Sequence, residues 1–167
     1  MEQLQDRFNK GGTRMVAAGA RTAPIQNRIK VLSKEEVEAL KTSNDGGVSS
    51  VYTRNQILTA SPAELTMMLY NGAIKFCNLA KKNIEEQDLE GANTNIQKAR
   101  KIIVEFRNNL DFNYEVAKDF DRVYEYIYRV LVEANVKKDP EMLDIALYHI
   151  KEMKDAWRQV MEANKKK

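Results

Sequence analysis

The apolar residues after position 60 recur every three or four positions along four long segments, and this spacing constrains the fold more than any other feature of the chain. Each segment is about 23–26 residues long, which corresponds to roughly 35–39 Å of α-helix. Only a few residues separate one segment from the next. Because short connections between long helices make neighbours antiparallel, the sequence predicts an all-α fold, an antiparallel up-down four-helix bundle.

Two of the expected helices carry strong start signals. Ser61-Pro62-Ala63-Glu64 places a capping serine before a proline at the first helical position, and the glutamate completes a capping box. Asp139-Pro140-Glu141 repeats the cap and the proline. The other two helices are expected to start near Asp88 and near Asn113. The first helix then presents a core face at helical spacing, made of Leu65, Leu69, Gly72, Phe76 and Leu79.

The part of the chain before residue 52 differs in composition from the rest. Five of the seven glycines lie before residue 48, and residues 1–31 show no sustained hydrophobic period. We therefore expect residues 1–51 to be a mostly disordered extension, with one short helix candidate at 33–41 that Ser33 would cap. Residues 52–167 are expected to form the four-helix-bundle domain.

The sequence offers little for catalysis or for metal binding. Its single cysteine, Cys77, excludes a disulfide framework and a cysteine-based zinc site. Its single histidine is His149, and Ala146 stands where the Glu-x-x-His pair of a di-metal bundle needs a glutamate. The sequence contains no Gly-rich phosphate loop. We therefore predict a protein that is not an enzyme and that uses no cofactor and no metal.

Charge and hydropathy argue against two classes of partner, nucleic acids and membranes. The net charge is only +3, whereas a nucleic-acid surface needs Lys and Arg gathered on one face. No uncharged apolar run approaches the roughly 20 residues of a membrane span. We therefore predict no nucleic-acid partner and no stable membrane insertion. The N-terminus lacks the apolar core of a secretion signal, and a lone cysteine fits a reducing compartment.

The first helix carries more apolar surface than one bundle face needs. Besides its core face it has a second stripe, centred about 150° away at 100° per residue, which consists of Met67, Tyr70, Ile74 and Cys77. A weaker strip on the third helix consists of Tyr128, Val132 and Val136. Two interpretations stay open. The first-helix stripe packs inside the protein, under the segment before Ser61 or against a neighbouring helix, or it forms a groove for an amphipathic partner helix.

The residues from Tyr52 to Phe76 carry a family resemblance. They contain, in order, a tyrosine, Asn-Gln, Thr-Ala-Ser-Pro, Glu-Leu and Met-Leu-Tyr-x-Gly. This order resembles the opening of the flagellar export chaperones of the FliS family. Further on, Tyr124-x-Tyr126-x-x-Arg129 resembles the third long helix of that family, and Ala156-Trp157 resembles its closing helix. The resemblance covers residues 52–162.

The resemblance implies a cytoplasmic chaperone. Such a protein would bind the disordered C-terminal segment of flagellin in apolar surface grooves, prevent premature polymerisation and keep the flagellin competent for flagellar type III export. The flagellar export gate protein would then receive the complex. By resemblance we expect partner contacts from Tyr52, Asn55, Gln56, Leu58, Ala60 and Ser61. Helical geometry adds the two surplus stripes of the first and third helices.

A rival hypothesis from another class is a structural four-helix interaction module that self-associates through its second stripe. A constitutive dimer that ignores flagellin would favour this rival. A metal or redox bundle enzyme is a third hypothesis, and the single histidine already argues against it.

Overall fold

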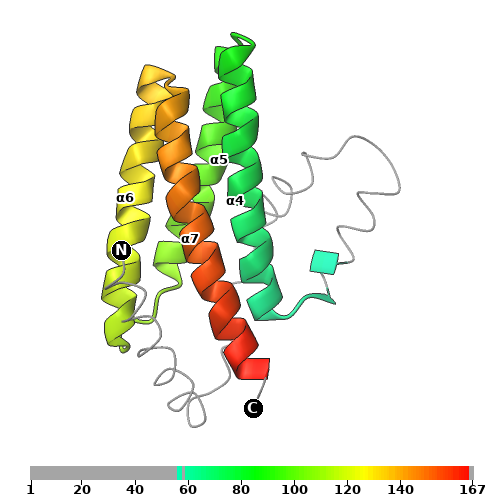
Figure 1. Ribbon diagram of the computed structural model, residues 1–167, viewed down its shortest axis with the longest axis vertical. Coiled ribbons are helices and arrows are strands. Elements are labelled where there is room, and N and C mark those ends of the chain that lie inside the picture. The colour runs from blue at the N-terminus through cyan, green and yellow to red at the C-terminus, as the bar shows by residue number, and fades with distance from the viewer. Residues whose placement is uncertain (1–55, 58, 166–167) are drawn as a thin grey trace.

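The computed structural model describes residues 56, 57 and 59–165, and within them four long helices make up the fold (Figure 1). Helix α4 spans Pro62–Glu85, α5 spans Leu89–Asn108, α6 spans Glu115–Lys137 and α7 spans Pro140–Lys165. The predicted all-α fold is confirmed. The extension 1–51 and its helix candidate at 33–41 lie outside the described residues.

The first two helices begin at the caps that the sequence predicts. The Ser61 hydroxyl accepts a hydrogen bond from the Glu64 backbone N–H at 3.3 Å. The Glu64 carboxylate accepts in return from the Ser61 backbone N–H at 2.8 Å, which completes the capping box. Asp88 caps α5 by accepting from the Gly91 backbone N–H at 2.9 Å. Local side-chain chemistry therefore fixes where α4 and α5 start.

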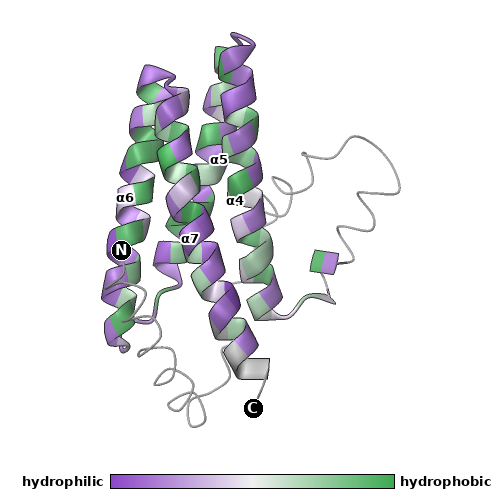
Figure 2. Cartoon of the chain, in the orientation of Figure 1, coloured by the Kyte–Doolittle hydropathy of each residue, from purple (hydrophilic) through white to green (hydrophobic). Residues whose placement is uncertain are grey.

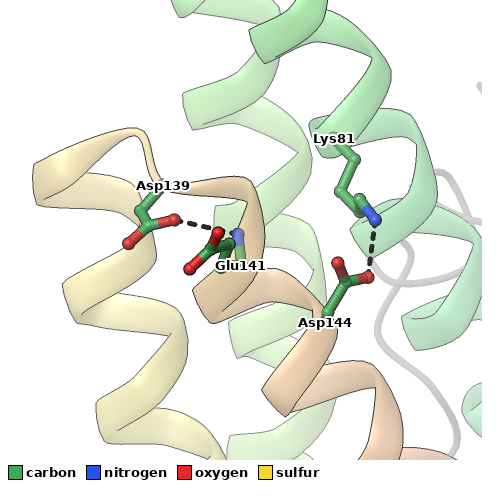
Figure 3. Close-up of polar contacts among 4 residues, drawn as sticks. All are labelled: Lys81, Asp139, Glu141 and Asp144. Atoms are coloured by element: carbon green, nitrogen blue, oxygen red, sulfur yellow. Dashed lines mark hydrogen bonds and ion pairs between the residues drawn. The ribbon is translucent and has the colours of Figure 1, made fainter.

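The turn between α6 and α7 depends on a residue that the sequence does not single out. Lys138 ends α6 with a left-handed backbone, φ 52°, a conformation more usual for glycine. Its ammonium group donates to the backbone and side-chain oxygens of Asn135, each at 2.7 Å. Asp139 then caps α7 by accepting from the Glu141 backbone N–H at 2.9 Å (Figure 3). This turn reverses the chain within a few residues.

The helices form a ring in which α4 packs on α5, α5 on α6, α6 on α7, and α7 returns to α4. The chain alternates direction from one helix to the next (Figure 1). Each helix therefore has two neighbours and buries two adjacent sides. Hydrophobic and hydrophilic residues are accordingly interspersed along α4, α6 and α7 (Figure 2).

The interior of the ring is apolar, and among the described residues no polar or charged residue is buried. Small side chains let the helices approach closely, since six alanines are fully buried: Ala73, Ala80, Ala92, Ala99, Ala134 and Ala146. Large side chains fill the remaining volume, led by Tyr70, Phe76, Ile96, Ile103, Ile127, Leu131, Leu143 and Ile150. The helical spacing of apolar residues in the second helix puts Leu89 on its core face, but Leu89 is 48% exposed because it is the first residue of α5, at the end of the bundle.

Candidate partner-binding surfaces

The second stripe of α4 lies toward α7. Lys81 follows Ile74 by seven residues, so both lie on the same side of α4. The Lys81 ammonium donates to Asp144 Oδ1 of α7 at 2.5 Å (Figure 3). The first stripe lies toward α5, because the Lys98 ammonium of α5 sits 5.4 Å from the centre of the Phe76 ring. Helix α4 is apolar on two sides because it has two neighbours.

Tyr70 and Cys77 are consequently core residues, which corrects the prediction of a surface stripe that includes them. Their exposed fractions are 2% and 0%. The Tyr70 ring crosses the interior, with its centroid 4.3 Å from that of Phe106 on α5. Its hydroxyl oxygen lies 2.5 Å from the hydroxyl oxygen of Tyr124 on α6. For these two residues the structure gives the interior packing that the sequence left open.

Burial also sets the ionisation of these core groups. Loss of water raises the pKa of Tyr70 well above its ordinary value, and the adjacent Tyr124 hydroxyl raises it further. Burial raises the pKa of Tyr124 as well. Burial raises the pKa of the Cys77 thiol to about 12. A protonated, buried thiol is a poor nucleophile, so Cys77 has a packing role.

Met67 and Ile74 are the parts of the α4 stripe nearest to solvent. Both are half-buried, and Ile74 packs against the edge of the hydrophobic core. They mark a narrow apolar margin where α4 meets α7. Because Ile74 supports the core, an acidic substitution there perturbs stability together with the surface.

The strip predicted on α6 is more open. It starts beside α5, where Arg100 donates from Nη2 to the Tyr128 hydroxyl at 2.6 Å. Each step of four residues rotates the side chain by about 40°, so the strip turns outward along the helix. Tyr128 and Val132 are half-buried, and Val136 is 79% exposed. This is an apolar surface on the α5–α6 side of the bundle.

The segment before α4 is described only in part. Ile57 is buried and belongs to the hydrophobic core, although sequence reasoning placed its neighbour Leu58 in the partner site. Gln56 and Ser61 are exposed, and Ala60 is half-buried. The remaining predicted residues of this segment, Tyr52, Asn55 and Leu58, lie outside the described residues. An apolar side chain from before α4 thus reaches the core.

Two classes of feature are missing from the part of the chain that the structure describes. No group of three or more His, Cys, Asp or Glu side chains there could hold a metal ion. None of the described helices is both long enough and apolar enough to cross a bilayer.

Comparison with known proteins identifies the family of this four-helix bundle. Residues 45–164 match the family described as flagellar protein FliS. The chain belongs to the FliS family. The flagellar secretion chaperone FliS of Bacillus subtilis (strain 168) is 41% identical over 117 residues, which cover 70% of this chain and 88% of that protein. The same chaperone of Vibrio cholerae is 31% identical over 108 residues, 64% of this chain and 79% of that protein.

A more distant relative, the flagellar secretion chaperone FliS of Salmonella typhimurium, is 26% identical over 115 residues, which cover 67% of this chain and 85% of that protein. These matches confirm the resemblance inferred from the Tyr52–Phe76 motif. The chain is a flagellar secretion chaperone, and the prediction that it is not an enzyme is confirmed by its family.

Within this FliS-family bundle, sequence reasoning missed most of the exposed apolar surface. None of the large exposed hydrophobic side chains described lies on α4. They lie on α5, α6, α7 and the α5–α6 connection: Leu89, Val104, Phe112, Tyr126, Val136, Ile145 and Tyr148. Only Val136 was predicted. A usable signal existed for Tyr126, since it stands within the Tyr124-x-Tyr126 motif.

The missed residues of α6 and α7 form an aromatic group. The His149 ring lies edge-on between two tyrosines, with centroid distances of 5.1 Å to Tyr126 and 5.1 Å to Tyr148. Burial lowers the pKa of His149, which favours the neutral imidazole. The group is on a different side of α6 from the Tyr128–Val136 strip.

Proposed function

We propose that this chain binds the C-terminal segment of flagellin in the cytoplasm, keeps it from polymerising and holds it ready for flagellar type III export. Membership of a flagellar secretion chaperone family supports the proposal. A rigid four-helix scaffold with apolar surface left over is suited to an amphipathic segment. The flagellar export gate protein would receive the resulting complex.

The strip of α6 is the main candidate contact. Val136 is the observation that carries this assignment, because a valine that is 79% exposed contributes nothing to the core of the free protein. Tyr128 and Val132 extend its surface toward α5. A partner helix that covered the three side chains would remove apolar surface from water at a gain of roughly 25 cal/mol per Å².

The α4–α7 margin is the second candidate contact. Met67 and Ile74 would touch the partner directly, and the buried Tyr70 and Cys77 would support them from the core. The family resemblance adds six further candidate contacts from before α4: Tyr52, Asn55, Gln56, Leu58, Ala60 and Ser61. In the helix ring, the α4–α7 and α5–α6 sides are opposite each other. A single segment that contacts both must therefore wrap around the bundle in an extended form.

Calorimetric titration of the full chain with a flagellin C-terminal segment of about 40 residues tests the proposal. We expect one-to-one binding, and Val136→Asp should weaken it by about tenfold or more. Tyr148→Asp is the matched control, because Tyr148 is 52% exposed on α7 and outside the proposed contacts. Both substitutions are at exposed positions and should leave the unfolding temperature near that of the unmodified chain.

Solution mass separates the chaperone from its rival. A chain that is dimeric at micromolar concentration and does not bind the flagellin segment is the self-associating module instead. Equal loss of binding in the Val136→Asp and Tyr148→Asp variants would remove the α5–α6 strip from the proposal.

A further inference from the structure

Three polar contacts join α5 to α6 in a regular register. Asn135 donates to Asn93 Oδ1 at 2.7 Å, Arg100 donates to the Tyr128 hydroxyl at 2.6 Å, and Arg107 pairs with Asp121. On α5 the three positions are seven residues apart, and on α6 they are again seven residues apart. Seven residues are two helical turns, so the contacts repeat along one seam between antiparallel helices.

The polar groups of the two outer contacts, Asn93–Asn135 and Arg107–Asp121, are well paired with each other. Arg107 donates from Nε to Asp121 Oδ1 at 2.6 Å and from Nη2 to Oδ2 at 3.2 Å. This two-point geometry is the one in which a guanidinium binds a carboxylate best. Asn93 and Asn135 pair through their side-chain amides.

The middle contact is incomplete. A guanidinium has five N–H donors, and Arg100 uses one of them on an acceptor in the described part of the chain, the Tyr128 hydroxyl. Its central carbon lies 4.7 Å from the centre of the Tyr128 ring, within the range of a cation–π contact. Arg100 Nε is buried and has no hydrogen-bond partner among the described residues. The buried Nε cannot be reached from outside, but the Nη hydrogens that do not bond Tyr128 have no acceptor among the described residues, so they can take one from a partner.

Apolar side chains lie on either side of this middle contact. Val104 is one turn beyond Arg100 on α5, and Val132 is one turn beyond Tyr128 on α6. Because the helices are antiparallel, the two valines lie in opposite directions along the seam, each about 6 Å away at 1.5 Å per residue. Val104 is 39% exposed and Val132 is half-buried. The seam thus offers a cationic centre between two apolar contacts.

We propose that Arg100 is a specificity-determining residue that binds a carboxylate of the partner segment, an inference that rests on the proposed binding of flagellin. A partner lying over the Tyr128–Val136 strip excludes water from the guanidinium. An uncompensated charge is costly to bury, so the partner must bring an acceptor. A carboxylate suits it best because it takes two N–H donors at once, as Asp121 does from Arg107.

The geometry specifies the partner sequence. A helix along the seam that places Asp or Glu at Arg100 must place apolar residues three or four positions before and after it, to reach Val132 and Val104. The ligand is therefore an amphipathic segment with an acidic residue inside its apolar face. A segment that is apolar throughout is disfavoured at this seam.

The test uses the full chain and the flagellin C-terminal segment of about 40 residues, with binding measured by calorimetry. Arg100→Met keeps a long side chain over Tyr128 but removes every donor. We expect this variant to bind about tenfold more weakly or worse, with an unfolding temperature equal to or above that of the unmodified chain, because the unpaired Nε is gone. Arg100→Lys should recover only part of the loss, since an ammonium cannot bind at two points.

Arg107→Met is the matched control. It removes a guanidinium from the same seam, but one already paired with Asp121, so it should lower the unfolding temperature and leave the affinity within about twofold of the original. A second form of the segment is prepared, in which the acidic residue that has apolar residues three or four positions before and after it is changed to Gln or Asn. The altered segment should bind the unmodified chain about tenfold more weakly than the original segment does. Its affinity for the Arg100→Met variant should be no lower than its affinity for the unmodified chain.

Two results would overturn the inference alone while the chaperone function stood. The first is an unchanged affinity of the Arg100→Met variant for the segment. The second is that the Arg100 change and the carboxylate change each weaken binding independently, so that their fold-losses multiply when both are present. Failure of the unmodified chain to bind the segment at all would instead overturn the proposed function, and this inference with it.

Discussion

The contact between the Tyr70 and Tyr124 hydroxyls joins α4 to α6 across the centre of the bundle, and it can be tested by removing one oxygen at a time. The two hydroxyl oxygens are 2.5 Å apart, and both side chains are buried. Tyr70→Phe deletes one hydroxyl and keeps the ring that packs on Phe106 at 4.3 Å. The Tyr124 hydroxyl is then buried without its partner.

The expected cost follows from that orphaned group. Leaving a buried hydroxyl unpaired destabilises a protein by about 1–3 kcal/mol. For a domain near one hundred residues, this lowers the unfolding temperature by roughly 5–15 °C. Tyr124→Phe should cost a similar amount, because it orphans Tyr70 instead. The double variant removes both hydroxyls and should recover to within about 1 kcal/mol of the original, since two apolar rings then face each other.

Thermal unfolding followed by far-ultraviolet circular dichroism measures all four proteins. We expect a coupling energy of about 1–3 kcal/mol between the two sites. If the double variant loses the sum of the two single losses, the hydroxyls act independently and this account of the core is wrong. Retained helicity at 20 °C in every variant is the control that the comparison is between folded states.

Three further predictions concern stability and reactivity. Ser61→Ala removes the capping box of α4 and should cost about 1 kcal/mol in denaturant unfolding; no change would mean that the cap is dispensable. Cys77, with its pKa of about 12 and no exposure, should react with a thiol reagent at pH 8 only as fast as the bundle opens, and a burst on mixing would refute its burial. Tyr70 and Tyr124 have folded-state pKa values above the 10.0 of the unfolded chain, so their contribution to stability is complete below pH 10 and is lost as pH rises beyond it. Absorbance of tyrosinate near 295 nm should therefore show these two residues ionising together with loss of helicity; their ionisation in the intact fold would contradict this.

Local signals in the sequence determined the helices. A serine or aspartate cap, a following proline and apolar residues at helical spacing act within one or two turns of the chain. They therefore locate the starts of α4 and α7 to within a residue, whatever the rest of the molecule does. The short connections likewise require antiparallel neighbours. The family motif from Tyr52 to Phe76 was also readable without any structure.

Local sequence signals do not determine which sides of a helix are buried. Whether Tyr70 and Cys77 face solvent or the interior depends on how many helices surround α4, and no residue of α4 encodes that number. Two neighbours, α5 and α7, cover both of its apolar stripes, so the surplus surface predicted there lies largely in the core. Leu89 shows the converse, an apolar residue at the end of the bundle with no neighbour to cover it.

The α5–α6 seam was decided by tertiary structure alone. Asn93, Arg100 and Arg107 share one side of α5, but nothing near them in the chain identifies their partners on α6. The pairing depends on the axial register of two antiparallel helices, which packing of the whole core fixes. The sequence by itself determined which segments are helical and which family they belong to. Only the tertiary structure decided which side chains meet, because a contact between helices is set by the positions of both.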